Sequence, residues 1–100
     1  MSRRRIGVRI SLLPTKDGGR SGPVLTGYRS LLRFEGTTVD FGFELELDPE
    51  FAVDGLEPGA TGSAQLSLWA FKELPALHPG QRFELREGIR VVGTGTIVDA

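Results

Sequence analysis

The last twenty residues, 81–100, constrain the fold more than any other stretch of the chain. Phe83 and Leu85 alternate with charged residues, which is the two-residue period of a strand with one buried face. Gly88 follows, and glycine accepts the positive φ angles that tight turns require. The stretch 89–98 has the composition of a second strand. These residues therefore predict a β-hairpin that is part of a sheet.

Four earlier segments also have the composition or the period of strands. We expect strands at 6–12, 24–34, 37–47 and 60–71. Loops rich in Gly and Pro separate them, and no segment combines a helical period with helix caps. This pattern predicts one all-β domain over residues 1–100, built as an antiparallel barrel or sandwich. The strand glycines Gly93 and Gly95 favour the barrel, because glycine lets a sheet curve.

Several side chains can be assigned to the predicted core. The apolar residues of 37–47 share one face: Phe41, Phe43, Leu45 and Leu47. The segment 24–34 is expected to bury Tyr28, Leu32 and Phe34, and one end of the sheet is expected to be covered by Phe51, Val53 and Leu56. Residues 1–5, with three successive arginines, are predicted to form a flexible basic terminus.

Composition argues against several classes of function. The chain has no Cys, which excludes disulfides and Cys-based metal sites and permits a reducing cytosol. No apolar stretch suits a signal peptide or a membrane span, so we expect a cytoplasmic protein. His78 is the only imidazole, which argues against a metal site, and no P-loop is present to bind a nucleotide. Glu44 and Glu46 share a strand face, where solvated carboxylates are more common than a catalytic pair. We therefore predict a non-enzymatic protein without a cofactor.

Charge is unevenly distributed although the net charge is only −1. The first 34 residues contain eight Lys or Arg and one Asp, whereas residues 35–73 contain one Lys and nine Asp or Glu. A basic segment can form an anion-binding face. Alternatively, it can neutralise the acidic segment inside one sheet, and a closed sheet favours this second interpretation because it brings the strands together.

The order and spacing of several motifs resemble the C-terminal domain of translation elongation factor Tu. The motifs are Lys16-Asp-Gly-Gly-Arg20, Gly27-Tyr-Arg29, Pro58-Gly59, Ser67-Leu-Trp69 and the block from Arg82 to Val98 with its Arg-Glu-Gly turn. The resemblance covers essentially 8–98. It implies a six-stranded antiparallel β-barrel that in the family contacts the T-stem of aminoacyl-tRNA, the GTPase domain and the nucleotide-exchange factor.

The resemblance also implies which residues face RNA. Arg20, Glu87 and Gly88 match the family's tRNA-facing elements, and Arg29 joins them as a candidate RNA-binding residue. Arginine can pair with phosphate, and Glu87 would accept from a ribose hydroxyl or a base amine. The chain departs from the family at Ser21, where the family has His, and at Ser30-Leu31, where it has Pro-Gln.

Two functions remain open from the sequence. The first is a protein-binding barrel whose partner occupies the place of the family's other domains, with Trp69, Phe71 and Leu74 as candidate interface residues. The second is binding of tRNA or another structured RNA through Arg20, Arg29, Glu87 and Gly88. A basic surface continuous with the Arg-Glu-Gly turn would favour RNA, and a surface of mixed charge would favour protein.

Overall fold

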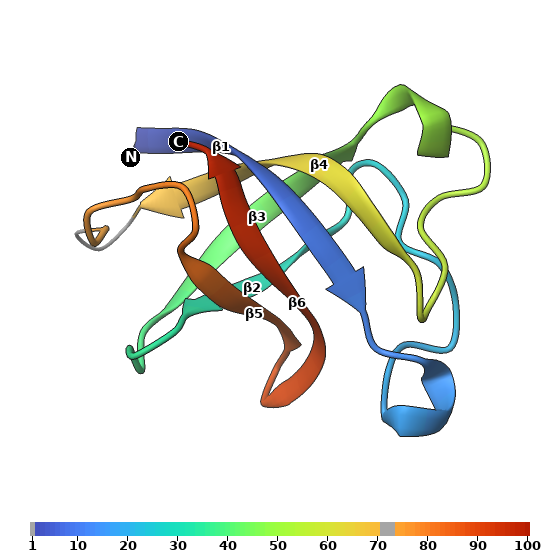
Figure 1. Cartoon of the computed structure of the whole chain (residues 1–100). Coiled ribbons are helices and arrows are strands. Elements are labelled where there is room, and N and C mark those ends of the chain that lie inside the picture. The colour runs from blue at the N-terminus through green and yellow to red at the C-terminus, as the bar shows by residue number, and fades with distance from the viewer. Residues whose placement is uncertain (1, 71–73) are drawn as a thin grey trace.

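Six antiparallel strands close into a barrel in the computed structural model, which describes residues 2–70 and 74–100 (Figure 1). The strands are β1 (Ser2–Leu12), β2 (Arg29–Phe34), β3 (Asp40–Leu47), β4 (Thr61–Ala70), β5 (Arg82–Glu87) and β6 (Arg90–Asp99). Their order around the barrel is β1-β4-β3-β2-β5-β6, and β6 pairs with β1 to close it. Two short 3-10 helices, η1 (Thr15–Asp17) and η2 (Pro49–Phe51), lie in the loops. The predicted all-β antiparallel barrel is confirmed.

Two strands differ in length from the prediction. β1 begins at Ser2, so the arginines expected in a flexible terminus belong to the sheet, where Arg3 pairs with Trp69 and Arg5 with Ser67 of β4. β2 begins only at Arg29, because Gly27 adopts a φ of 96° that a strand does not allow. Val24, predicted to lie in this strand, instead makes an isolated bridge to Leu56.

The core fills the barrel with apolar side chains from every strand. All four apolar residues of β3 are buried as predicted, as are Leu32 and Phe34, whereas Tyr28 is only partly buried. The fully buried side chains include Ile6, Val8, Ile10, Phe43, Leu45, Leu66, Leu68, Leu85 and Ile97. Leu56 also lies in the core and Phe51 packs against it, but the prediction for Val53 is wrong. Val53 is 90% exposed because it lies in the turn that follows η2 and leads to Gly55.

Glycines allow aromatic rings to lie flat against the sheet at two positions. A methyl group at Gly42 would lie 2.9 Å from Cε3 of Trp69, its neighbour on β4. A methyl group at Gly95 would overlap the buried ring of Phe83, its partner on β5. The packing of Trp69 on the outer face at Gly42 and of Phe83 on the inner face at Gly95 therefore requires a residue without a side chain.

Candidate functional site

One polar site surrounds Glu87, at the turn between β5 and β6. Glu87 ends β5, Gly88 takes a φ of 65°, and Arg90 begins β6. Tyr28 Oη donates a hydrogen bond of 2.6 Å to Glu87 Oε2, and Arg20 Nη1 donates to the same oxygen. The Arg20 guanidinium also lies 4.8 Å from the centre of the Tyr28 ring, which is a cation–π contact. We call Arg20, Tyr28, Glu87 and Arg90 the Glu87 site.

The electrostatics of this site keep Glu87 ionised and Tyr28 neutral at pH 7. Burial alone would raise the pKa of Glu87, but hydrogen bonds from Tyr28 and Arg20 outweigh it, and the pKa lies below its usual value. Burial, followed by the hydrogen bond to Glu87, raises the pKa of Tyr28. Arg90 adds an ion pair, with Nη2 3.6 Å from Glu87 Oε1. The donor that Glu87 was predicted to find on RNA is thus already supplied by Tyr28 and Arg20.

Further hydrogen bonds fix the turn itself. Arg86 Nη2 donates to the carbonyl oxygen of Ile89 at 2.9 Å, and Arg86 Nη1 lies 3.2 Å from Glu84 Oε1. Ser30 Oγ donates to the carbonyl oxygen of Arg86. This hydrogen bond from β2 holds the end of β5 that leads into the turn. The turn leaves the Ile89 side chain 92% exposed, a feature that the sequence did not single out.

Arg29 does not join the Glu87 site. It lies on the outer face of β2, where its Nη2 is 3.1 Å from Glu44 Oε1 and its guanidinium is 5.1 Å from the centre of the Trp69 ring. Arg3 contacts the same two residues, at 3.4 Å from Glu44 Oε1 and 5.2 Å from the Trp69 ring. We call Arg3, Arg29, Glu44 and Trp69 the Trp69 cluster. The structure therefore brings together Arg20, Glu87 and Gly88 but places Arg29 in a second cluster.

Of the predicted interface residues, the structure describes Trp69 and Leu74, and neither is an exposed side chain. Trp69 is partly buried and contacts two guanidinium groups, whereas Leu74 packs against the core. Phe71, the third residue of that prediction, lies outside the described residues.

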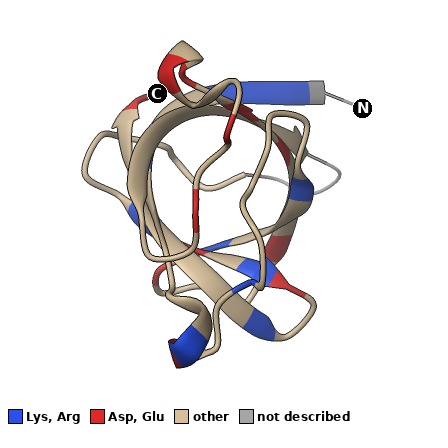
Figure 2. Ribbon diagram, turned by 90° about the vertical axis from the view of Figure 1, so that its right-hand side faces the viewer, with Lys and Arg blue, Asp and Glu red and all other residues tan. Residues whose placement is uncertain are grey.

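Basic and acidic residues occur on neighbouring segments of the barrel, as the blue and red parts of the ribbon in Figure 2 show. Arg3 and Arg29 pair with Glu44, Arg5 lies 2.7 Å from Glu46, and Arg33 lies 2.7 Å from Asp40. The basic first third and the acidic middle therefore neutralise each other, between β2 and β3 and also between β1 and β3 across β4, which confirms the second interpretation of the charge pattern.

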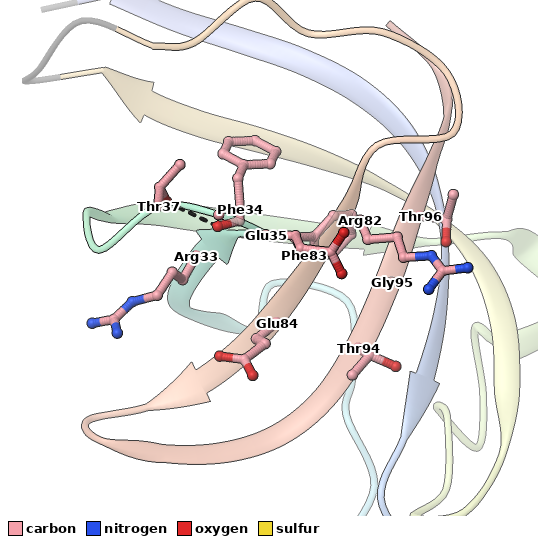
Figure 3. A pocket seen from close by; sticks show the side chains of 11 residues that line it. Arg33, Phe34, Glu35, Thr37, Arg82, Phe83, Glu84, Thr94, Gly95 and Thr96 are labelled. Atoms are coloured by element: carbon pink, nitrogen blue, oxygen red, sulfur yellow. Dashed lines mark hydrogen bonds between the residues drawn. The ribbon is translucent and has the colours of Figure 1, made fainter.

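A groove of about 670 Å³ lies at the end of the β5–β6 hairpin opposite the turn (Figure 3). It was not predicted, because its walls come from segments distant in sequence. They are the β2–β3 turn and the paired strands β5 and β6: Arg33, Phe34, Glu35, Gly36, Thr37, Arg82, Phe83, Glu84, Thr94, Gly95 and Thr96.

Within residues 2–70 and 74–100, no group of three or more His, Cys, Asp or Glu is placed to bind a metal. None of the helices in those residues has the length and apolar character to cross a membrane.

The family comparison makes this closed antiparallel barrel a module of the translation-factor class. More narrowly, the chain belongs to the elongation factor Tu C-terminal domain family, whose model matches residues 2–100. It is similar to Elongation factor Tu 2 of Streptomyces avermitilis, with 42% identity over 94 residues. That alignment covers 94% of this chain and 22% of the relative, so the chain spans less than a quarter of the relative's length.

Proposed function

We propose that this chain is a non-enzymatic protein-binding barrel, which docks onto a protein segment equivalent to the rest of an elongation factor Tu. The reason is the mixed charge of its surface. Arg20 and Arg90 share Glu87, and Arg29 shares Glu44 with Arg3. RNA affinity depends on cations that neutralise phosphates, and carboxylates at the same positions oppose it. Protein interfaces tolerate paired charges of this kind at their rim.

The Trp69 cluster is the proposed docking surface. Trp and Arg are the residues that most often dominate protein interfaces, and here a Trp lies between two Arg on the outer face of the sheet. Glu44 holds both guanidinium groups, so the cluster is ordered before a partner binds. Preorganisation lowers the entropic cost of binding. Because Glu44 already pairs with both arginines, the cluster suits a partner with an apolar surface and charges of both signs at its rim.

Titration calorimetry tests this proposal directly. The probe is the part of Streptomyces avermitilis Elongation factor Tu 2 that lies outside the matched 22%. We expect binding, weakened at least about tenfold by Trp69→Ala, and unchanged by Val53→Ala, which alters an exposed residue of a different loop. An absence of binding, or equal affinity of the wild type and Trp69→Ala, rejects the proposal.

RNA binding is the second candidate, and one observation favours it. The structure gathers Arg20, Glu87 and exposed Gly88 at one turn, where a backbone amide can approach a sugar-phosphate chain closely. Fluorescence anisotropy with tRNA at about 50 and 200 mM salt distinguishes the two functions. Salt-sensitive binding that the double variant Arg20→Ala, Glu87→Ala weakens would replace the protein proposal. Under that proposal we expect no binding at either salt concentration.

A further inference from the structure

Ile89 has an apolar side chain that is exposed to solvent, on a turn fixed by hydrogen bonds. It is 92% exposed, and the turn between β5 and β6 projects from one end of the barrel (Figure 1). Arg86 binds its carbonyl oxygen, while Tyr28 and Arg20 fix Glu87 two residues earlier. A side chain on a fixed backbone loses little conformational entropy on binding. Ile89 therefore has the properties of an anchor for a hollow on another molecule.

The groove at the other end of the same hairpin suits this anchor. Its volume of about 670 Å³ lies in the range of binding pockets and exceeds the needs of one isoleucine. Gly36 leaves part of its lining without a side chain, because a methyl group built at Gly36 would meet no atom within 4 Å, and Thr94 and Thr96 lie on the β6 side (Figure 3). An apolar side chain can enter there without displacing a large residue.

One carboxylate in the groove is a candidate partner for the arginine beside the anchor. Arg90, next to Ile89, is 56% exposed on its side chain and lies at the long distance of 3.6 Å from Glu87. In the groove, the structure gives the exposed Glu35 carboxylate no ion pair within residues 2–70 and 74–100. An Arg90 brought to the groove would therefore meet a carboxylate without an ion pair, and it would compete for that carboxylate with Arg82, which lines the same groove.

We propose that the occupant of the groove is the Ile89 turn of a second copy of this chain. The turn and the groove lie at opposite ends of one hairpin, about 15 Å apart along β5 for a rise of 3.3 Å per residue. Two hairpins placed antiparallel about a two-fold axis then put each Ile89 into the other copy's groove. Such an interface is self-complementary and closes at the dimer. It involves neither Trp69 nor Glu44, so it is independent of the function proposed above.

Sedimentation velocity between about 10 µM and 1 mM measures this association, since a contact this small predicts a weak dimer. We expect the wild type to shift from monomer to dimer over this range. Ile89→Ser should weaken the dimer about 100-fold, about tenfold for each of the two anchors lost. The matched control is Val53→Ser, which removes a side chain with 90% exposure from another loop and should leave the dimer unchanged. A wild type that stays monomeric, or a control that dissociates equally, overturns the proposal.

A charge swap tests the predicted pairing of Arg90 with Glu35. Glu35→Arg and Arg90→Glu should each impair self-association, because each creates two like-charge contacts per dimer. An equimolar mixture of the two variants should associate like the wild type. In the mixed dimer, one site keeps the native Arg90–Glu35 pair, and the other pairs the two introduced charges, which are also of opposite sign. Circular dichroism of each variant confirms folding. A mixture no better than its components refutes the pairing, whereas amide shifts on dilution at both Ile89 and Glu35 support it.

Discussion

Gly42→Ala should detach Trp69 from the outer face of the barrel. The backbone at Gly42 does not have a positive φ, so alanine is allowed there. Its methyl group would lie 2.9 Å from Trp69 Cε3, which is shorter than the ordinary contact distance of 3.4–4 Å. The ring must therefore move away from β3, and Arg3 and Arg29 must lose their positions over it.

The magnitude follows from three contributions. Relieving an overpacked contact costs about 1–3 kcal/mol. Loss of two cation–π contacts costs about 0.5–1 kcal/mol each. Replacement of glycine by alanine stabilises the folded state by about 0.4–1 kcal/mol, because it restricts the conformations of the unfolded chain. We expect a net loss of about 3 kcal/mol in the free energy of unfolding, which lowers the urea midpoint by about 1.5 M.

Trp69 reports on this change directly because it is the only Trp in the chain. Urea unfolding followed by circular dichroism gives the stability, and acrylamide quenching of Trp69 fluorescence gives its exposure. Gly22→Ala is the matched control, because no atom lies within 4 Å of the added methyl group and the φ of Gly22 is not positive. Wild-type quenching and stability in Gly42→Ala would refute the packing of Trp69 on Gly42.

Three further substitutions test the site and the core. Tyr28→Phe removes a hydrogen-bond donor to Glu87. Because the pKa of Glu87 is lowered in the folded state, the Glu87 carboxylate stabilises the fold above its unfolded-state pKa, and this contribution is lost as the pH falls through the folded-state pKa. We expect a loss of about 1–2 kcal/mol at pH 7 that shrinks below about pH 4, measured by urea unfolding at both pH values; a loss independent of pH contradicts this. Leu66→Ala empties a fully buried position of β4 and should cost about 3 kcal/mol, whereas Leu25→Ala, at a side chain 53% exposed, should cost far less. Gly95→Ala drives a methyl group into the Phe83 ring and to 3.1 Å from the carbonyl oxygen of Arg9, so thermal melts should show a loss of about 3 kcal/mol; a melting temperature equal to that of the wild type would show that the ring can move aside.

Strands with an apolar face were predictable because their signal is local. Phe41 to Leu47 alternates without interruption, and the side chains that the pattern assigned inward are the buried ones. The prediction began this strand at residue 6 because Arg3 to Arg5 carry no apolar alternation, whereas β1 begins at Ser2. Their strand conformation comes from pairing with β4 and from ion pairs to Glu44 and Glu46, which no local pattern reveals.

The candidate sites were only partly predictable for the same reason. The sequence motifs identified Arg20, Glu87 and Gly88, but they did not show that Glu87 is already bound. Its partners Tyr28 and Arg20 lie 59 and 67 residues away in sequence. Arg29 follows Tyr28 directly yet joins a different cluster, because β2 begins at Arg29 and pairs it with Glu44 of β3, whereas Tyr28 precedes the strand. The groove likewise needs β2 beside β5, and that neighbourhood depends on the strand order.

The pairing of the first strand with the last determines when this fold can form during synthesis. β1 has β4 on one side, but its other side is covered only by β6, which ends at Asp99. Until the ribosome has released β6, the exposed edges of β1 and β5 can pair with other nascent chains. Completion of the barrel is therefore a late, non-local step, and protection of these two edges by chaperones should matter most in the interval before β6 emerges.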